Sequence, residues 1–187
     1  MKKIRIAVLG KGVVGKSSLT YRFINYNAPD KHDATIEDRY STNATINGVN
    51  YDIEILDTAG EEDFQNMIDM WINFGDGFVL VFALNDEESF KILDRKRERI
   101  LKTKKDTDGN PPILLVGNKQ DLEKERVISY TEGKMKADSW KSEYIETSAK
   151  TNFNCKEAFE KITTKIIEKK QDLINNSKNG CPSCEMF

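Results

Sequence analysis

A glycine-rich segment near the N-terminus constrains the fold of this chain more than any other feature. Residues 10–17 read GKGVVGKS and fit the pattern G-x-x-x-x-G-K-[ST]. An apolar run, Ile4–Leu9, precedes the segment, and a helical pattern, Ser17–Ile24, follows it. A strand, a glycine turn and a helix N-terminus together make the setting in which backbone N–H groups and a helix dipole bind phosphate. The segment therefore predicts a phosphate-binding loop, although a glycine-rich turn carrying a surface lysine would also match the bare pattern.

Each residue type in this loop has a chemical role. Glycines let the backbone wrap closely around an anion and turn successive N–H groups inward. We expect Lys16 to reach the β- and γ-phosphates and the Ser17 hydroxyl to bind Mg²⁺. The residues expected to contact the nucleotide here are Gly10, Lys11, Gly12, Val13, Val14, Gly15, Lys16, Ser17 and Ser18.

Length and composition limit the classes of protein to consider. A chain of 187 residues is suited to one domain with a sizeable core. Its net charge of -2 gives no basis for nucleic-acid binding, which usually shows a basic face. No apolar run approaches the length of a transmembrane helix. The 3 cysteines are an odd count and form no disulfide framework, which favours a reduced, cytosolic setting.

Hydrophobic periodicity predicts a mostly parallel sheet with helices on both faces. We expect six strands, at residues 4–9, 40–46, 49–56, 77–84, 113–116 and 144–146. Asn47-Gly48 is a hairpin signal, so the second and third strands should form one antiparallel pair. Helices are expected at 17–24, 67–74, 87–101, 129–140 and 152–173. The alternation predicts an α/β domain over residues 1–173, followed by a flexible C-terminal tail, 174–187.

A second polar segment follows a predicted strand. Asp57, Thr58, Ala59 and Gly60 come directly after the predicted strand 49–56 and are expected to contact the nucleotide. Ligands of open α/β sheets bind outside the carboxyl ends of the strands, so Asp57 should face the ligand of the phosphate loop and hold Mg²⁺. Gly60 lets its N–H approach the terminal phosphate. An Asp that closes a strand into a turn is the plainer alternative.

Two further segments suggest recognition of a base. Asn118-Lys119-Gln120-Asp121 follows the strand 113–116, and a carboxylate such as that of Asp121 can accept two hydrogen bonds from the edge of guanine, which adenine does not offer. Alone, this segment could be a surface turn. After the last strand come Ser148, Ala149 and Lys150, whose backbone N–H groups could meet the guanine carbonyl.

Together with Thr35, these segments resemble those of the Ras-like small GTPases in order and spacing, over nearly the whole chain. The resemblance implies the P-loop NTPase fold of small G proteins, bound GTP or GDP with Mg²⁺, and GTP hydrolysis of the kind known for Ras. It assigns catalysis to Lys16, Thr35, Gly60 and Glu61, and the metal to Ser17, Thr35 and Asp57. It also implies an effector loop made of Thr35, Ile36, Glu37, Asp38, Arg39 and Tyr40.

The implied partners are an exchange factor, a GTPase-activating protein, effector proteins and a membrane, with the chain itself a monomer. Cys184-Glu185-Met186-Phe187 fits the C-a-a-X prenylation box, and Phe in the last place favours geranylgeranyl. One lipid chain anchors marginally, so Cys181 is expected to carry a second, palmitoyl group. We expect the protein at the cytoplasmic face of the plasma membrane; two stray cysteines on a tail are the alternative.

The chain departs from the family pattern at several positions. Glu61 replaces the usual water-positioning Gln and, when ionised, can only accept hydrogen bonds. Slow hydrolysis is the leading hypothesis, and a GTP-dependent binding module with little turnover is the alternative. Val13 replaces a usual Gly and should crowd the loop, while Ala28 lacks the aromatic ring that stacks on guanine. A P-loop ATPase or kinase is disfavoured by the segments at 118–121 and 148–150.

Overall fold

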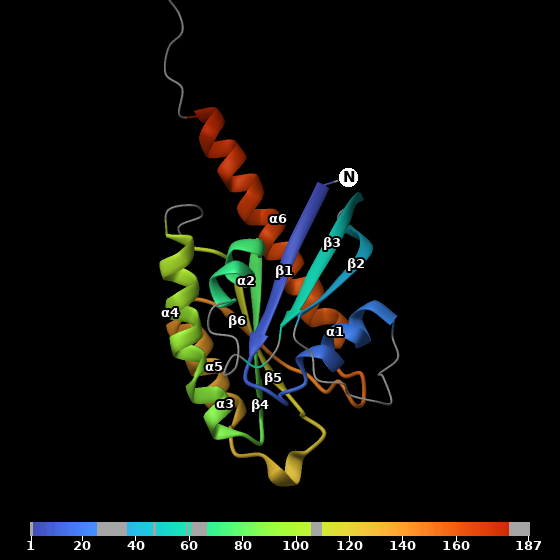
Figure 1. Ribbon diagram of the computed structural model, residues 1–187, viewed down its shortest axis with the longest axis vertical. Helices are drawn as coiled ribbons and strands as arrows, with labels where there is room; N and C mark the ends of the chain where they lie inside the picture. The colour runs from blue at the N-terminus through green and yellow to red at the C-terminus, as the bar shows by residue number, and fades with distance from the viewer. Residues whose placement is uncertain are drawn as a thin grey trace, which may run out of the picture.

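A computed structural model describes residues 2–25, 37–46, 48–58, 60, 67–105 and 110–179 of the chain. Several predicted functional residues lie outside this set: Ala28, Thr35, Ile36, Ala59, Glu61, Cys181 and Cys184. The described residues form a six-stranded sheet in the order β2-β3-β1-β4-β5-β6 (Figure 1). Its strands are β1 (Lys2–Gly10), β2 (Glu37–Ile46), β3 (Val49–Thr58), β4 (Gly77–Ala83), β5 (Ile113–Asn118) and β6 (Glu143–Glu146).

The pairing confirms the predicted mostly parallel sheet. Strand β1 pairs in parallel with both β3 and β4, and β5 pairs in parallel with β4 and β6. Only β2 and β3 are antiparallel within the described residues, as the Asn47-Gly48 turn signal predicted. Strand β4 is buried along its whole length because helices cover both faces of the sheet.

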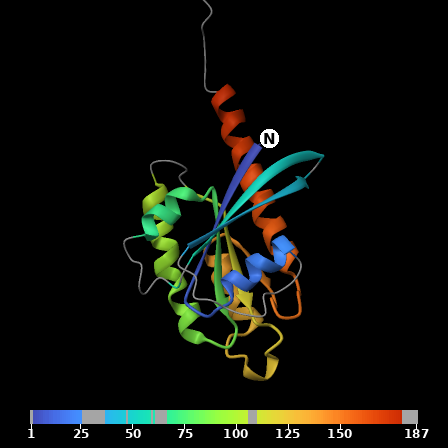
Figure 2. The ribbon, with the colours of Figure 1, turned by 45° about the vertical axis from the view of Figure 1, so that its right-hand side comes forward.

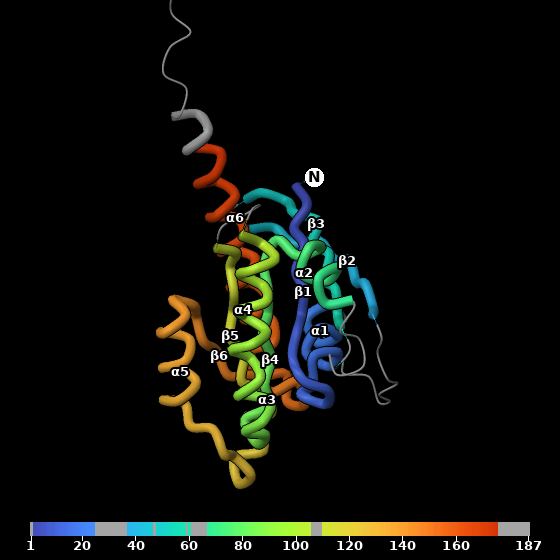
Figure 3. Tube along the Cα trace, turned by 60° about the vertical axis from the view of Figure 1, so that its left-hand side comes forward, coloured from blue at the N-terminus to red at the C-terminus, as the bar shows by residue number. Residues whose placement is uncertain are grey.

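Two hydrophobic cores lie on opposite faces of this sheet. On one face, α1 (Lys16–Asn25) and α6 (Cys155–Asn179) pack through Leu19, Phe159 and Ile162. On the other, α2 (Ile68–Phe74), α4 (Leu93–Lys104) and α5 (Tyr130–Ser139) pack through Trp71 and Ile100. Figure 2 shows α1 beside α6, and Figure 3 brings α4 and α5 forward. Both faces of the sheet are therefore covered.

Two helix boundaries differ from the sequence prediction. The single helix expected at 87–101 is divided into α3 (Glu87–Lys91) and α4. The break is slight, because Ile92 keeps helical dihedrals and its N–H still donates to the Glu88 carbonyl. Helix α6 continues to Asn179, past the boundary predicted at residue 173, and projects beyond the sheet (Figure 1). The rest of the predicted tail, 180–187, lies outside the described residues.

Candidate nucleotide-binding site

The predicted functional segments follow the carboxyl ends of parallel strands. Strand β1 leads into the phosphate loop and ends at Gly10, β3 ends at Thr58, β5 ends at Asn118, and β6 ends at Glu146 just before the loop around Ser148. Because these strands run in the same direction, their carboxyl ends meet at one edge of the sheet. Segments that are far apart in the sequence thus gather there.

The Lys16 ammonium is buried in the phosphate loop. The residue is only 5% exposed, and its Nζ donates to the Gly10 carbonyl at 3.1 Å and to the Lys11 carbonyl at 2.9 Å. A buried ammonium costs free energy unless acceptors surround it. The loop therefore positions a cation at the N-terminus of α1, where the helix dipole also favours an anion.

Close contacts, together with a positive φ at Gly15, explain two of the loop glycines. A Cβ on Gly10 would lie 2.2 Å from the Val81 carbonyl oxygen. Gly15 has a φ of +94°, and a Cβ there would lie 2.4 Å from Nδ2 of Asn118. No L side chain fits either position without moving a neighbouring strand or loop.

Val13 does not crowd the interior of the loop, contrary to the sequence expectation. Its side chain is 90% exposed, so it points to solvent. The cost of replacing glycine appears in the backbone instead: Val13 has a φ of +64°, the left-handed region, which is unfavourable for a β-branched residue. The phosphate loop therefore holds local strain at this residue.

Asp57 is a buried acid whose charge is only partly compensated by its neighbours. Its residue is 0% exposed, and neither carboxylate oxygen has a well-aligned hydrogen bond to the described residues. Burial raises the pKa of Asp57 to about 6, while the nearby Ser17 hydroxyl and Lys16 ammonium lower it. Orphaned acceptors of this kind fit a bound cation or a donor that the protein does not supply.

Together, Ser17 and Asp57 fit Mg²⁺ as partial ligands. Mg²⁺ usually takes one or two carboxylates and completes its shell with water and substrate phosphates. Among the described residues, no group of three acidic, histidine or cysteine side chains could form an all-protein metal cage. The donor set thus suits a metal held jointly with a phosphate ligand.

A pH titration tests the burial of Asp57. Its folded pKa lies above the unfolded value of 3.8, so the folded state binds more protons between about pH 4 and 6. The stabilising contribution of the protonated form is therefore lost as pH rises through this window. Relative to Asp57→Asn, we expect the nucleotide-free protein to lose about 3 kcal/mol of unfolding free energy by pH 7. Urea unfolding of both proteins at several pH values measures the difference, and a pH-independent difference would contradict it.

The remaining residues of this segment contact the sheet and the phosphate loop. The Thr58 hydroxyl donates to the Val8 carbonyl at 2.8 Å, so this side chain, predicted to contact nucleotide, joins β3 to β1. A Cβ on Gly60 would lie 2.6 Å from the Gly12 nitrogen. Gly60 therefore lies directly against the phosphate loop, where its predicted role requires it.

Asn118 connects three loops. Its Nδ2 donates to the Val14 carbonyl at 2.9 Å, and its Oδ1 accepts from the Thr147 hydroxyl at 3.1 Å and from the Ala149 N–H at 3.2 Å. The residue is only 2% exposed. One amide side chain thus fixes the phosphate loop relative to both segments predicted to read the base.

The Asp121 carboxylate lies beside the segment 148–150. The Ser148 hydroxyl donates to Asp121 Oδ1 at 2.6 Å, and Lys150 Nζ lies 3.9 Å from Oδ2. Lys119 has a φ of +68°, which turns the chain sharply between Asn118 and Asp121. The structure therefore brings together the residues predicted for base recognition.

Sequence reasoning missed two contacts around the site. Lys11 forms ion pairs with Asp86 at 3.3 Å and with Glu88, so its side chain ties the phosphate loop to the start of α3. Trp71 Nε1 donates to Glu37 Oε2 at 2.9 Å, which joins the start of β2 to α2. Neither pair follows from a motif, because each joins residues that lie far apart in the sequence.

The described part of the predicted effector loop is the beginning of β2. Glu37 also accepts two hydrogen bonds from Arg39, whose guanidinium lies 5.3 Å from the Phe74 ring centroid. Burial, followed by the charge of Asp38, raises the pKa of Tyr40. These contacts place the segment against α2 at the edge of the sheet.

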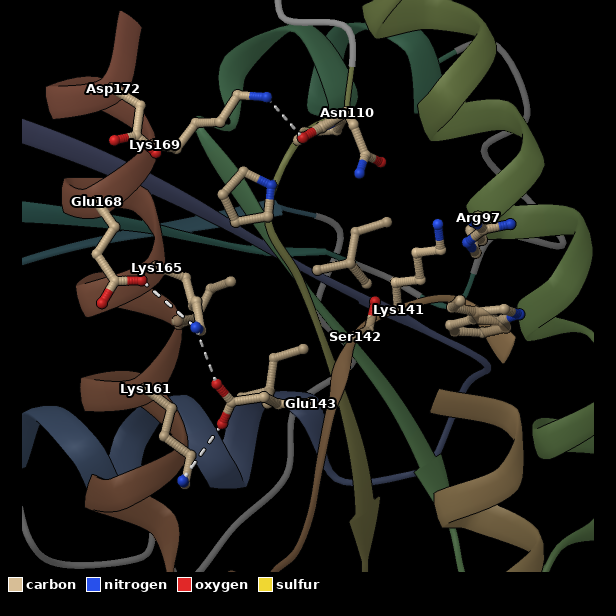
Figure 4. A pocket seen from close by; sticks show the side chains of 16 residues that line it. Arg97, Asn110, Lys141, Ser142, Glu143, Lys161, Lys165, Glu168, Lys169 and Asp172 are labelled. Atoms are coloured by element: carbon tan, nitrogen blue, oxygen red, sulfur yellow. Dashed lines mark hydrogen bonds and ion pairs between the residues drawn. The ribbon is translucent and has the colours of Figure 1, made fainter. Parts of the chain in front are cut away.

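A cavity of about 360 Å³ lies away from these segments, where β5 and β6 begin (Figure 4). Three of its four lysines are already paired: Lys161 and Lys165 lie 3.4 and 3.3 Å from Glu143, and Lys169 donates to the Asn110 carbonyl. None of the predicted site residues lines this cavity. The predicted site residues gather instead at the opposite end of the strands.

In the described part of the chain, no helix has the length and apolar character needed to cross a membrane.

Comparison with known proteins agrees with the geometry of the loop cluster. The model of the Ras family matches residues 5–168. Ras-related protein O-RAL from Diplobatis ommata is 39% identical over 176 residues, which cover 94% of this chain and 84% of that protein. The chain thus belongs to the Ras family of small GTPases, which bind guanine nucleotide and hydrolyse GTP.

Proposed function

We propose that this GTPase is a signalling switch that hydrolyses GTP slowly and is anchored by lipid at the cytoplasmic face of the plasma membrane. The observation that carries the switch is the Asn118 side chain, which hydrogen-bonds the phosphate loop at Val14 and the base loop at Ala149. Phosphate and base recognition therefore belong to one rigid unit, as a nucleotide-gated switch requires.

The phosphates of the nucleotide are bound by charged and polar groups that the loop holds in place. Lys16 and the N–H groups of the loop neutralise the β- and γ-phosphates without any covalent step. Ser17, Thr35 and Asp57 would hold Mg²⁺, which when bound supplies further neutralisation of phosphate charge. The burial of the Asp57 carboxylate beside Ser17 and Lys16 supports this assignment.

The base end is read by hydrogen bonds. The Asp121 carboxylate accepts from the N1–H and the 2-amino group of guanine, and the Ser148–Lys150 loop donates to the guanine carbonyl. A site with polar groups placed for one base rejects a base that leaves them unpaired. This explains selection of guanine over adenine.

Switching depends on two segments that the γ-phosphate orders. Thr35 and Gly60 would be drawn to the γ-phosphate and released on hydrolysis. The contact between Glu37 and Trp71 supports coupling, because it joins the elements that follow these two segments. Effectors would read Thr35–Tyr40, while an exchange factor and an activating protein would set the balance of states.

The membrane anchor rests on the C-terminal sequence. Cys184 is the proposed prenylation site and Cys181 the proposed palmitoylation site. Two lipid signals give stable binding where one is marginal. Helix α6, which precedes these residues in the sequence, projects beyond the sheet (Figure 1).

Single-turnover hydrolysis tests the catalytic part of the proposal. Glu61 still has acceptor oxygens for the attacking water, so we expect the native chain to convert bound GTP to GDP slowly, and Glu61→Gln to change the rate. No turnover in the native chain, with GTP retained, would favour the alternative of a GTP-dependent binding module. The observation that favours this alternative is Glu61, which replaces the usual Gln and, when ionised, can only accept hydrogen bonds.

A further inference from the structure

Arg22 on α1 reaches across to the loop predicted to read the base. Its Nε donates to the Ala149 carbonyl at 2.7 Å, and its Nη2 donates to the Lys150 carbonyl at 3.0 Å. The guanidinium is a rigid planar fork, so two simultaneous bonds fix the orientation of both acceptors. Arg22 therefore holds two consecutive peptide groups of this loop.

This hold determines where the Lys150 N–H points. The Ala149 carbonyl and the Lys150 N–H belong to the same planar trans peptide and point to opposite sides of the chain. With the carbonyl bound to Arg22, the N–H must be directed away from the guanidinium. The other N–H groups of the loop already have acceptors: Ser148 N–H donates to Phe153 O, Ala149 N–H to Asn118 Oδ1, and Thr151 N–H to Ser148 Oγ.

The Lys150 N–H is thus the backbone donor of residues 148–151 that has no acceptor among the described residues. A backbone donor with no acceptor in the protein is free to bond water or the acceptor of a ligand. The Asp121 carboxylate borders the same loop through Ser148. An acceptor and an oriented donor are therefore both available for one purine edge.

We propose that Arg22 is a positioning residue for base recognition, which holds the Lys150 N–H toward the purine O6. The inference rests on the proposed role of the Ser148–Lys150 loop and adds a residue outside every motif. Arg22 lies on α1, which begins at the phosphate loop. Its hydrogen bonds therefore connect the loop proposed to recognise the base with the helix whose N-terminus binds phosphate.

Packing of α1 does not depend on this arginine. Leu19 is fully buried, and the Phe23 ring stacks on Phe159 with centroids 4.5 Å apart. These contacts hold α1 against α6 without the guanidinium. Arg22→Met is therefore expected to fold, and its effect should appear in nucleotide binding.

The test measures dissociation constants for three diphosphates in Mg²⁺. GDP carries O6, inosine diphosphate keeps O6 but lacks the 2-amino group, and the 2-aminopurine nucleotide has hydrogen in place of O6. For Arg22→Met we expect about a tenfold loss of affinity for GDP and inosine diphosphate, the size of one hydrogen bond between neutral groups. For the 2-aminopurine nucleotide we expect a loss of about twofold or less, since there is no O6 to lose. Arg22→Lys keeps the charge but lacks the planar fork of the guanidinium. Its affinity for GDP and inosine diphosphate should therefore lie between those of the native chain and Arg22→Met.

The control is Arg95→Met, which removes an exposed arginine of α4 and should leave all three constants unchanged. Equal losses for all three nucleotides in Arg22→Met would overturn the inference, because the effect of a purely structural arginine does not depend on whether the nucleotide carries O6. If the native chain itself binds GDP and the 2-aminopurine nucleotide equally, the proposed base-reading role of the loop fails, and the inference falls with it. Discrimination in the native chain with uniform losses in the variant would refute only the role of Arg22.

Discussion

Lys16→Met is expected to weaken GDP binding by between about 10² and 10⁴. Two carbonyls of its own loop hold the Lys16 ammonium in a buried position, ready to meet phosphate oxygens. Each hydrogen bond from a charged donor contributes about 1.5–3 kcal/mol, and two such bonds to phosphate give this range. Fluorescent GDP competition under saturating Mg²⁺ measures the loss.

The folded state should survive this substitution, because methionine replaces a buried ammonium with a flexible apolar chain of similar length. Lys156→Met, an exposed lysine of α6, is the matched control and should bind GDP like the native chain. An affinity of Lys16→Met within threefold of native would show that the ammonium does not contact phosphate.

Asn118→Ala is expected to destabilise the protein by about 2–4 kcal/mol. The substitution removes three hydrogen bonds and leaves the Val14 carbonyl, the Thr147 hydroxyl and the Ala149 N–H buried without their partner. Each bond contributes about 0.5–1.5 kcal/mol, and buried groups left unsatisfied add to the loss. Urea unfolding of the nucleotide-free protein gives the value directly.

Nucleotide affinity should fall together with stability in Asn118→Ala, because the phosphate and base loops are no longer fixed relative to each other. Asn43→Ala, at an exposed position of β2, should change stability by no more than about 0.5 kcal/mol. Lost stability with unchanged GDP affinity would mean that Asn118 supports the fold without organising the site.

The sequence predicted where residues would gather when a motif fixes both residue type and spacing. Lys16, Asp57, Asn118 and Asp121 were predicted to contact nucleotide or metal, and the structure brings them to one edge of the sheet. The physical reason is that each motif follows a strand, and parallel strands present their carboxyl ends together. Motifs that are far apart in the sequence therefore lie close together in the fold.

Prediction failed where the effect depends on backbone conformation or on distant pairs. Val13 was expected to crowd the loop, yet it is exposed and strained in φ. Arg22 and Lys11 belong to recognisable segments, but their partners at residues 149–150 and 86–88 lie on other elements. A one-dimensional pattern carries no information about such contacts.

Helix boundaries show a similar limit. The periodicity of 87–101 does not reveal the irregularity at Ile92, because the chain stays nearly helical there. The polar composition after residue 173 suggested a tail, but helical residues continue to Asn179. A polar segment has no apolar face to bury, but its backbone can still be helical.

The proposed site binds phosphate through Lys16 and a metal-binding carboxylate, Asp57, and recognises guanine through Asp121. The most direct measurement is the affinity of the native chain for GDP and ADP, each with Mg²⁺ and after its chelation. We expect tight GDP binding that weakens at least tenfold on chelation, together with much weaker ADP binding. Equal affinity for GDP and ADP, or GDP binding indifferent to Mg²⁺, would contradict it.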